Sequence, residues 1–385
     1  GITSTGASVR LLGITSTPAV AYLSRSMQAT AGVVISASHN PIEDNGLKFF
    51  DGNGFKLSNS VEEQIEKCYF EAGDELPRAE GTSIGQVYRD GEALGNYYKY
   101  LKKSAPSLTG LSLVVDCAHG AACLVAGELL KSLGAKVNML HDVPDGSLIN
   151  VNCGTTDTAA LQREVLRLGA SLGLAFDGDA DRLIAVDEKG NVVDGDGIMS
   201  ICAVDMAGKG LLNKQTLVAT VMSNGGLDIL GEKHGFKVLR TPVGDRFVID
   251  KITEGNYNFG GEQSGHIIFS DHATTGDGFL AALQLLKVVQ EKQQPLSELA
   301  SCLVRLPQVL INQKVKTKEG WSENQDITVA IDRVKQKLGP HGRILVRPSG
   351  TEQKIRVMLE APLPEDKLEQ YARSLAEIIA REQSV

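Results

Sequence analysis

The sequence has no closely spaced pair of cysteines, no long apolar run and no excess of positive charge. The scattered cysteines indicate reduced thiols in a cytoplasmic protein, because a disulfide framework or a Cys-X-X-Cys motif would place them in pairs. They are Cys68, Cys117, Cys123, Cys153, Cys202 and Cys302. No stretch is apolar over the length that crossing a bilayer requires, and the first residues carry no signal-peptide pattern.

The charge balance is acidic, with a formal net charge of −8 over 385 residues. This balance disfavours a nucleic-acid or membrane partner, although a few local arginines can still bind an anionic small molecule. The chain is longer than one hydrophobic core supports, and its length predicts about two to four domains.

Two stretches of the chain repeat one plan. Residues 112–140 and 216–242 each run from an apolar strand through a helix to a glycine and a second strand. Such a unit predicts a parallel sheet. The opening residues "STGASVRLLG" match the end of the same unit, with Gly6 as the helix stop. We therefore expect three similar α/β domains with mixed or parallel sheets, the first without its opening strand and most of a helix; generic strand–helix–strand similarity is the alternative.

The last part of the chain has a different pattern. Strands are predicted at 306–315 and 343–347, with "ITVAIDRVKQKL" as a helix between them and "KIRVMLEA" as a further strand. The final helix has apolar residues at helical spacing: Leu368, Tyr371, Leu375, Ile378 and Ile379. We expect a smaller C-terminal α+β domain. The predicted domains are 1–95, 96–195, 196–308 and 309–385.

The stretch "LGLAFDGDADRLIAVDEKGNVV" (172–193) places three carboxylates on a tight loop between two apolar strands. Asp177, Asp179 and Asp181 alternate with small residues and can converge on one hard cation such as Mg²⁺. An EF-hand loop is a rival, but it needs glycine where this chain has Arg182, and a strand rather than a helix follows. A solvated acidic turn explains poorly why apolar strands flank the carboxylates.

Two further loops have the composition of anion and sugar sites. In "ILVRPSGTEQKIRVMLE" (344–360), hydroxyls and backbone N–H groups lie between two arginines, which suits a phosphate. In "NFGGEQSGHIIFSDHATTGDG" (258–278), Glu262 and Ser264 suit sugar hydroxyls, and His266 suits proton donation or phosphate binding. The structural alternatives are a hairpin turn with surface arginines and a buried structural histidine.

Ser38 lies in "AGVVISASHNPIEDNGLKFFDG" (31–52), after a run of small and β-branched residues. If Ser38 ends a strand, His39 points to the opposite face and is badly placed to activate it. An Asx-type turn before proline is the structural alternative. Combined with a metal loop, a phosphate loop and a sugar loop, this serine suggests phosphoryl transfer to a sugar phosphate. Ser38 then needs no base, because it enters the reaction already phosphorylated.

Four motifs together resemble the α-D-phosphohexomutase family. "SASHNP", "DGDADR", "GEQSGH" and "RPSGTE" are similar, in this order, to its phosphoserine, metal, sugar and phosphate loops. The resemblance covers nearly the whole chain and implies four domains around a central cleft. "GVVISASHNPIEDNGLKFF" is most similar to the bacterial branch that acts on glucosamine phosphates, and the phosphomannomutase/phosphoglucomutase branch is the next nearest.

The resemblance implies a reaction and a metal. Glucosamine 6-phosphate and glucosamine 1-phosphate would interconvert through a bisphosphate intermediate, supplying amino-sugar and cell-wall precursor synthesis in the cytoplasm. Ser38 would be the phosphoserine. Mg²⁺ would be bound by Ser38, through its phosphate, together with Asp177, Asp179 and Asp181. The expected partner is a small hexosamine phosphate, with no nucleic acid and no membrane, and a homodimer is left open.

The resemblance also implies further site residues. Lys48, Arg182 and His266 would lie near the transferring group, Lys48 as an acid/base or a phosphate contact. The residues implied to bind the sugar and its non-reacting phosphate are Glu262, Ser264, Arg347, Ser349, Gly350, Thr351 and Arg356.

The chain departs from the family pattern in two places. Gln353 and Lys354 follow "SGTE", where the family has proline and an apolar residue, and Lys354 either alters phosphate affinity or points to solvent. The first domain also lacks the family's "GTDGIRG"-like loop. A sugar-phosphate-binding protein without turnover, and a phosphatase, therefore remain alternatives to the mutase.

Overall fold

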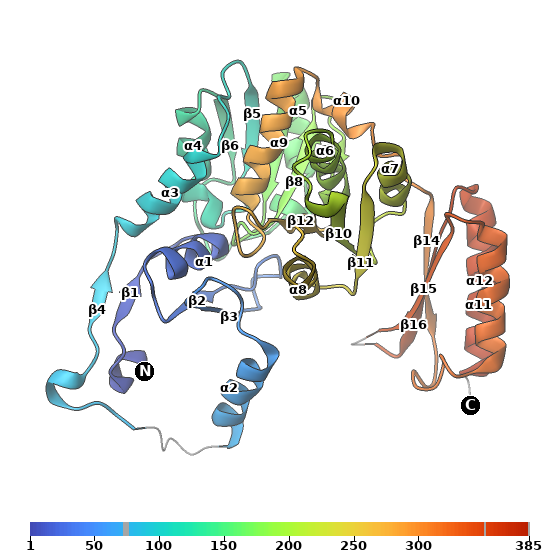
Figure 1. The fold of residues 1–385 in the computed structure, drawn as a ribbon, viewed down its shortest axis with the longest axis horizontal. Coiled ribbons are helices and arrows are strands. Elements are labelled where there is room, and N and C mark those ends of the chain that lie inside the picture. The colour runs from blue at the N-terminus through green and yellow to red at the C-terminus, as the bar shows by residue number, and fades with distance from the viewer. Residues whose placement is uncertain (72–76, 350–351, 384–385) are drawn as a thin grey trace.

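The computed structural model describes residues 1–71, 77–349 and 352–383. Three α/β units are grouped together, and a C-terminal unit lies to one side of them (Figure 1). None of the described helices combines the length and the apolar character that crossing a membrane requires.

The second unit is built on a five-stranded sheet of order β6-β5-β7-β8-β9. Strands β5, β6 and β7 are parallel, and β8 and β9 continue the sheet antiparallel. Every residue of β7 and β8 is buried, which explains their continuous apolar sequence. The elements are β5 (Ser112–Asp116), β6 (Lys136–Leu140), β7 (Leu172–Phe176), β8 (Leu183–Asp187), β9 (Val192–Val193), α4 (Ala126–Ser132) and α5 (Ala159–Leu168).

The third unit repeats this arrangement with the strand order β11-β10-β12-β13. Here too the first three strands are parallel and the last is antiparallel, as the predicted internal repeat requires. Its strands are β10 (Thr216–Thr220), β11 (Lys237–Thr241), β12 (Phe259–Gly261) and β13 (Ile267–Phe269). Its helices are α6 (Gly195–Gly208), α7 (Gly226–His234), α8 (Asp245–Gly255), α9 (Gly278–Lys292) and α10 (Leu296–Ala300).

The first unit has two separate strand pairs among its described residues. Strands β1 and β4 are parallel, and β2 and β3 form an antiparallel pair equivalent to β7–β8 and β12–β13. The helix tail predicted at the N-terminus is a 3₁₀ turn that ends at Gly6, with φ of 91°. The elements are β1 (Val9–Leu11), β2 (Ala31–Ile35), β3 (Leu47–Asp51), β4 (Val87–Arg89), α1 (Thr17–Ser26), α2 (Asn59–Glu71) and α3 (Ala93–Lys103).

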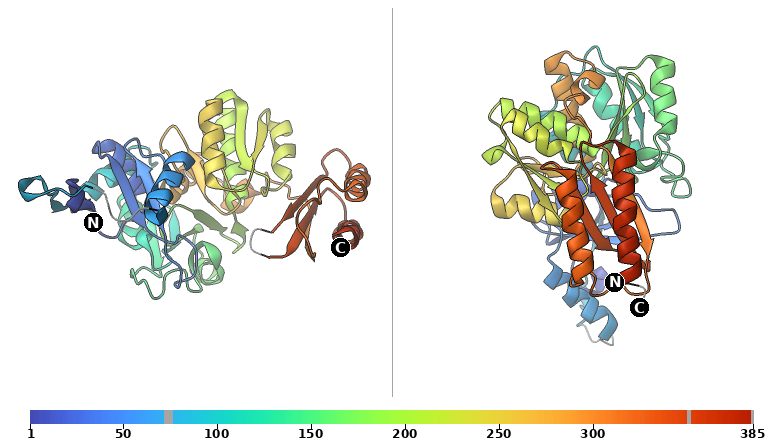
Figure 2. Two further views of the ribbon diagram at one scale, coloured as in Figure 1. Left: turned by 90° about the horizontal axis from the view of Figure 1, so that it is seen from below. Right: turned by 90° about the vertical axis from the view of Figure 1, so that its right-hand side faces the viewer.

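The C-terminal unit is an antiparallel sheet of order β14-β16-β15 covered by two helices, as predicted. Figure 2 shows these helices side by side over the sheet. The elements are β14 (Gln308–Lys314), β15 (Arg343–Pro348), β16 (Lys354–Glu360), α11 (Gln325–Leu338) and α12 (Glu365–Glu382). Their apolar residues form a core distinct from that of the other units, and Leu368, Leu375 and Ile379 belong to it.

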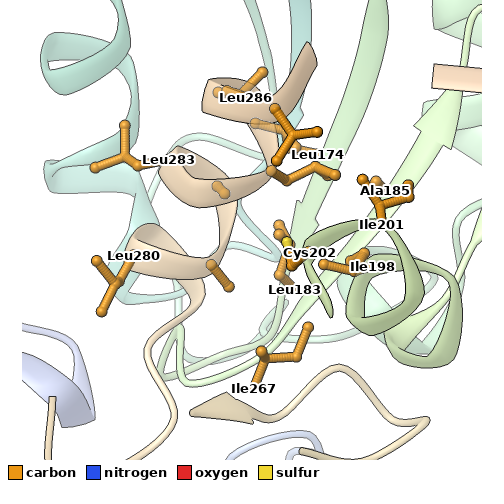
Figure 3. Close-up of a cluster of buried hydrophobic side chains, with 14 of the residues drawn as sticks. Leu174, Leu183, Ala185, Ile198, Ile201, Cys202, Ile267, Leu280, Leu283 and Leu286 are labelled. Atoms are coloured by element: carbon orange, nitrogen blue, oxygen red, sulfur yellow. The ribbon is translucent and has the colours of Figure 1, made fainter. Parts of the chain in front are cut away.

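The main core continues across the second and third units. Leucine and isoleucine side chains of α6 and α9 pack against β7 and β8 (Figure 3). Leu174, Leu183, Ile198 and Leu283 are each fully buried. Burial of one such side chain stabilises the fold by about 1.5–3 kcal/mol. The loop between β7 and β8 therefore starts and ends at fully buried strands.

Candidate active site

The loop between β7 and β8 brings three carboxylates together. Asp177, Asp179 and Asp181 are at most 3% exposed, and one oxygen from each lies within 4.8 Å of the others. Their proximity follows from local sequence, because Gly178 and Ala180 separate them on a tight turn. Ala180 has a φ of 55°, and a Cβ at Gly178 would approach the Ser38 carbonyl oxygen to 2.6 Å.

This set of ligands suits a hard divalent cation such as Mg²⁺. Asp179 Oδ1 and Asp181 Oδ1 are buried and accept no hydrogen bond from the described residues. Burial, followed by the charges of Asp181 and Asp179, raises the pKa of Asp177 well above its usual value. A bound dication would relieve this repulsion, so the three aspartates can hold a metal ion.

A lysine and a threonine from the first unit contact the same carboxylates. Lys48 Nζ donates to Asp179 and lies 3.0 Å from Asp181 Oδ2. The Thr17 hydroxyl also donates to Asp179, and the Thr17 N–H donates to the Asp179 carbonyl at 3.0 Å. Although burial opposes the charged form, Asp181 and Asp179 raise the pKa of Lys48. Lys48 is therefore an ammonium group at neutral pH.

Ser38 lies against the aspartate loop. Its hydroxyl donates to Asp177 Oδ2 at 2.7 Å, across 139 positions of sequence. The loop that carries Ser38 is held on both sides, because the Ser38 N–H donates to Ser36 Oγ at 2.9 Å and Asn150 Nδ2 donates to the Ser38 carbonyl at 2.8 Å. The predicted serine and the predicted metal loop therefore share one site.

The expectation that His39 faces away from Ser38 was wrong. Strand β2 ends at Ile35, and Ser38 lies in a turn with φ of 55°, so the alternation of a strand does not apply. His39 Nδ1 is 3.4 Å from Ser38 Oγ. Burial, and then the charge of Arg182, lower the pKa of His39, which leaves its ring neutral at pH 7.

Arg182 and His266 surround the aspartates from the other side. The backbone N–H of Arg182 donates to Asp177 Oδ1 at 3.0 Å. The Arg182 Nε atom lies 4.0 Å from Asp177 Oδ2 and 4.0 Å from Asp181 Oδ1. His266 Nδ1 lies 3.6 Å from Asp181 Oδ1. His266 Nε2 accepts the Gly276 N–H at 3.0 Å and lies 3.5 Å from Asp245 Oδ2. Burial alone would lower the pKa of His266, but the neighbouring Asp181 carboxylate outweighs burial, and the pKa of His266 is raised.

The remaining members of the predicted sugar loop lie between β12 and β13. Glu262 is partly buried and accepts the Gly244 N–H at 3.2 Å, whereas Ser264 is exposed. His266 connects this loop to the aspartate loop through Asp181. The loops that follow β2, β7 and β12 thus occupy equivalent places in the three units.

The predicted phosphate loop lies at one end of the C-terminal sheet. Arg347 and Arg356 are directly opposite each other on β15 and β16. Ser349 is 2% exposed, and its hydroxyl lies 3.5 Å from Arg356 Nη2. Lys354, whose place in the loop departs from the family pattern, forms an ion pair with Glu352 at 2.5 Å.

Two predicted members of this loop, Gly350 and Thr351, lie outside the described residues. Among the residues that are described, no hydrogen bond or ion pair joins Arg347, Ser349 or Arg356 to the aspartates. The structure thus gathers the predicted residues into two groups, one around Ser38 and one around Arg347.

Sequence reasoning missed several residues that shape the site. Thr17, Asn150 and Asp245 contact Asp179, Ser38 and His266 respectively. Thr17 follows Ser16, which caps α1, so "STP" marks a helix start but gives no sign of a distant carboxylate. For Asn150 and Asp245 the sequence offers no local signal.

Comparison with known proteins gives matches along most of the chain. Residues 1–75, 93–190 and 194–306 match the alpha/beta/alpha domains I, II and III of phosphoglucomutase/phosphomannomutase, and residues 310–378 match its C-terminal domain. A phosphoglucosamine mutase of Thermoanaerobacter pseudethanolicus is 51% identical over 99% of this chain and 86% of its own length. One of Symbiobacterium thermophilum is 49% identical over 99% of this chain and 85% of its own length.

Solved structures have the same fold at lower identity. A phosphoglucomutase/phosphomannomutase family protein of Burkholderia thailandensis has a TM-score of 0.77 at 21% identity, covering 98% of this chain and 85% of that protein. The N-acetylphosphoglucosamine mutase of Aspergillus fumigatus, in complex with GlcNAc-6P and magnesium, has a TM-score of 0.71 at 20% identity, covering 96% and 93%.

Proposed function

The chain belongs to the phosphoglucomutase/phosphomannomutase family, and from that premise we propose that it interconverts glucosamine 6-phosphate and glucosamine 1-phosphate. One observation carries the chemistry: Ser38 Oγ lies 2.7 Å from a carboxylate of the aspartate loop. The choice of an amino sugar depends on two relatives, 49% and 51% identical in sequence, that are phosphoglucosamine mutases. A cytoplasmic location is part of the same proposal.

The proposed reaction has two phosphoryl transfers. In the first, the bond between phosphorus and Ser38 Oγ breaks, a bond to a hydroxyl of the sugar phosphate forms, and the hydroxyl proton leaves to a basic group. The sugar is then a bisphosphate. In the second, the other phosphoryl group returns to Ser38 Oγ and a proton returns to the sugar oxygen. No phosphate is consumed, so the net change is an isomerisation.

The residues around Ser38 suit electrostatic stabilisation of a transferring phosphoryl group. Asp177, Asp179 and Asp181 would hold Mg²⁺, which supplies positive charge to the phosphoryl oxygens when it is bound. Lys48 keeps its proton beside these carboxylates, which favours a phosphate contact over an acid/base role. Arg182 adds a second positive charge at this side of the loop.

His266 is proposed to position Asp181 rather than to transfer a proton itself. His266 is 3% exposed, and both ring nitrogens have neighbours: Nδ1 faces Asp181 and Nε2 accepts from Gly276. Glu262 and Ser264, on the same loop, are proposed to bind sugar hydroxyls, since Ser264 is exposed and the second oxygen of Glu262 accepts no hydrogen bond from the described residues.

The C-terminal loop is proposed to hold the phosphate that does not react. Arg347 and Arg356 lie directly opposite each other on neighbouring strands, and two arginines so placed can offer paired donors to a phosphate dianion. The proposed ligands are Arg347, Ser349, Gly350, Thr351 and Arg356. Because these ligands belong to a separate unit, they can bind the non-reacting phosphate of the sugar while the reacting phosphate lies at Ser38.

The proposal is tested by turnover of glucosamine 6-phosphate, glucose 6-phosphate and mannose 6-phosphate in the presence of Mg²⁺. The expected result is a clear preference for glucosamine 6-phosphate. In Ser38→Ala, kcat for this substrate should fall by at least about a thousandfold because no covalent acceptor remains. Ser374→Ala, at an exposed site on α12, is the matched control and keeps full activity.

Other outcomes would identify the alternatives. A preference for mannose 6-phosphate would move the protein to the phosphomannomutase/phosphoglucomutase branch. Sugar-phosphate binding without turnover would favour a binding protein, and net release of inorganic phosphate would favour a phosphatase. Activity that survives Ser38→Ala would remove Ser38 from the reaction.

A further inference from the structure

A second cluster of metal-ligating side chains lies in the second unit, apart from the aspartate loop. It consists of Asp116, His141 and Cys153, each of which offers one ligand atom within 4.8 Å of the other two. Asp116 and Cys153 are fully buried, and the His141 side chain is 26% exposed. The mutase reaction proposed above uses none of these residues.

The three residues meet because of the sheet topology. Asp116 ends β5, His141 follows β6, and Cys153 lies on the segment that leads from β6 to α5. Since β5 and β6 are parallel, their carboxyl ends meet at one edge of the sheet. The N–H groups of Ala118 and Gly154 donate to the two oxygens of Asp116 at 2.9 and 3.1 Å, which fixes the carboxylate facing His141.

The geometry at His141 differs from that of an ordinary aspartate–histidine pair. His141 Nδ1 lies 3.0 Å from Asp116 Oδ1, yet this buried nitrogen forms no aligned hydrogen bond with any described residue. The Cys153 sulfur is within 4.8 Å of both atoms. His141 also has a φ of 48°, an uncommon value for a residue other than glycine.

The donor set selects a class of metal. One nitrogen, one oxygen and one sulfur suit Zn²⁺ and similar borderline ions, whereas Mg²⁺ prefers oxygen alone. Cys123 Sγ donates to the His141 carbonyl at 3.4 Å, so a second thiol lies beside the cluster. A carboxylate and a thiolate would together balance the two charges of the ion.

We propose that Asp116, His141 and Cys153 form a second metal site that binds a borderline divalent ion of the Zn²⁺ class. Binding replaces the thiol proton of Cys153 by a metal–sulfur bond and releases that proton to solvent. The proposal stands whether or not the chain is a mutase, because it uses none of the residues assigned to that reaction.

The position of the cluster connects it to the Ser38 loop. Asn150, shortly before Cys153 in the chain, donates its N–H to the Ala118 carbonyl at 3.1 Å and its side chain to the Ser38 carbonyl at 2.8 Å. An ion at the cluster would therefore fix the segment that supports Ser38.

The test is a titration of the full chain with Co²⁺ in the presence of excess Mg²⁺, followed by absorption. A thiolate ligand gives a near-ultraviolet sulfur-to-cobalt charge-transfer band, which the all-oxygen aspartate site cannot give. We expect this band to saturate at one ion per chain and to disappear on addition of Zn²⁺. Cys153→Ser should abolish it, and His141→Gln should weaken Co²⁺ binding at least about tenfold.

Cys68→Ser is the matched control, because Cys68 is an exposed cysteine on α2, and it should leave the band unchanged. No charge-transfer band in the unsubstituted chain, or a band that persists in Cys153→Ser, would overturn the proposal. His141 is partly exposed, so His141→Gln gives the answer even where Cys153→Ser does not fold. None of these readouts depends on sugar-phosphate turnover.

Discussion

The aspartate loop and the C-terminal phosphate loop are built in opposite ways. The aspartate loop is buried in the main core, and side chains from the first and third units contact it. The phosphate loop stands on a small sheet with its own core, and Arg356 is 32% exposed. The C-terminal unit meets the third unit through contacts such as Arg343 to the Ser223 carbonyl at 2.7 Å and the Gly225 N–H to Glu360 at 2.6 Å.

This difference corresponds to the two roles proposed for the loops, which are phosphoryl transfer at one end of the substrate and phosphate binding at the other. Phosphoryl transfer needs atoms placed to within a fraction of an ångström, which a well-packed loop provides. Binding of the distant phosphate needs charge and a pair of donors, which a loop on a separate unit provides. Substitutions near the aspartate loop should therefore lower kcat, and those in the phosphate loop should raise KM.

Among substitutions that leave Ser38 in place, the largest effect is expected where the contact between the aspartate loop and the Ser38 loop is crowded. In Gly178→Ala, the new Cβ would meet the Ser38 carbonyl oxygen at 2.6 Å and the Ile149 side chain at 2.8 Å. We expect kcat to fall by at least about a hundredfold with little change in KM, because Ser38 is displaced from Asp177. Steady-state kinetics on glucosamine 6-phosphate measures this.

The matched control is Gly208→Ala, at the end of α6, where nothing lies within 4 Å of the added Cβ. It should retain full activity. An unchanged kcat in Gly178→Ala would mean that close contact between the two loops is not needed for the reaction.

A smaller effect is expected in the phosphate loop. Arg347→Gln removes one of the two arginines that lie opposite each other on β15 and β16. We expect KM for glucosamine 6-phosphate to rise about tenfold at nearly constant kcat, since a hydrogen bond to a charged group contributes about 1.5–3 kcal/mol. Arg373→Gln, in an exposed ion pair on α12, should change neither constant. A fall in kcat at constant KM would place Arg347 in the chemical step.

The last prediction concerns stability and not activity, and it depends on Asp277, a buried acid of the third unit. Asp277 caps α9 and accepts a hydrogen bond from Tyr97 at 2.7 Å, and burial raises its pKa to about 6. The folded state therefore binds a proton that the unfolded state releases near pH 4. The free energy of unfolding should fall by about 3 kcal/mol from this residue as the pH rises from about 4 to about 6.

In Asp277→Asn this contribution is absent, so urea unfolding at several pH values should show a weaker decline of stability over that range. Asp326→Asn, at an exposed position in the first turn of α11, should leave the pH dependence unchanged. An equal slope in the unsubstituted protein and Asp277→Asn would show that Asp277 ionises normally.

The sequence predicts those features whose residues lie close together along the chain. Asp177, Asp179 and Asp181 follow an apolar strand on a short turn, so both their chemistry and their convergence are local. The strands and helices of the C-terminal unit have clear periodicity, and the two complete strand–helix–strand units end their helices at glycine.

Contacts between distant segments were not predictable from the residues alone. The hydrogen bond between Ser38 and Asp177 joins positions 139 apart, and their meeting was inferred from the combined chemistry of the motifs and from the family resemblance, not from any local pattern. The placement of His39 failed because the chain leaves β2 before Ser38 and enters a left-handed turn. The Asp116–His141–Cys153 cluster has no sequence signature, since its members approach only through the order of β5 and β6.

The most direct test of the reaction follows a labelled phosphoryl group on Ser38. The protein is phosphorylated by incubation with a labelled hexose bisphosphate, which leaves as the hexose monophosphate, and the label is mapped by peptide analysis. The labelled protein is then mixed with glucosamine 6-phosphate with and without a chelator of divalent ions. We expect label at Ser38 that moves to the sugar phosphate only when Mg²⁺ is present. Label on another residue, or transfer that the chelator does not slow, would contradict the proposed phosphoserine reaction.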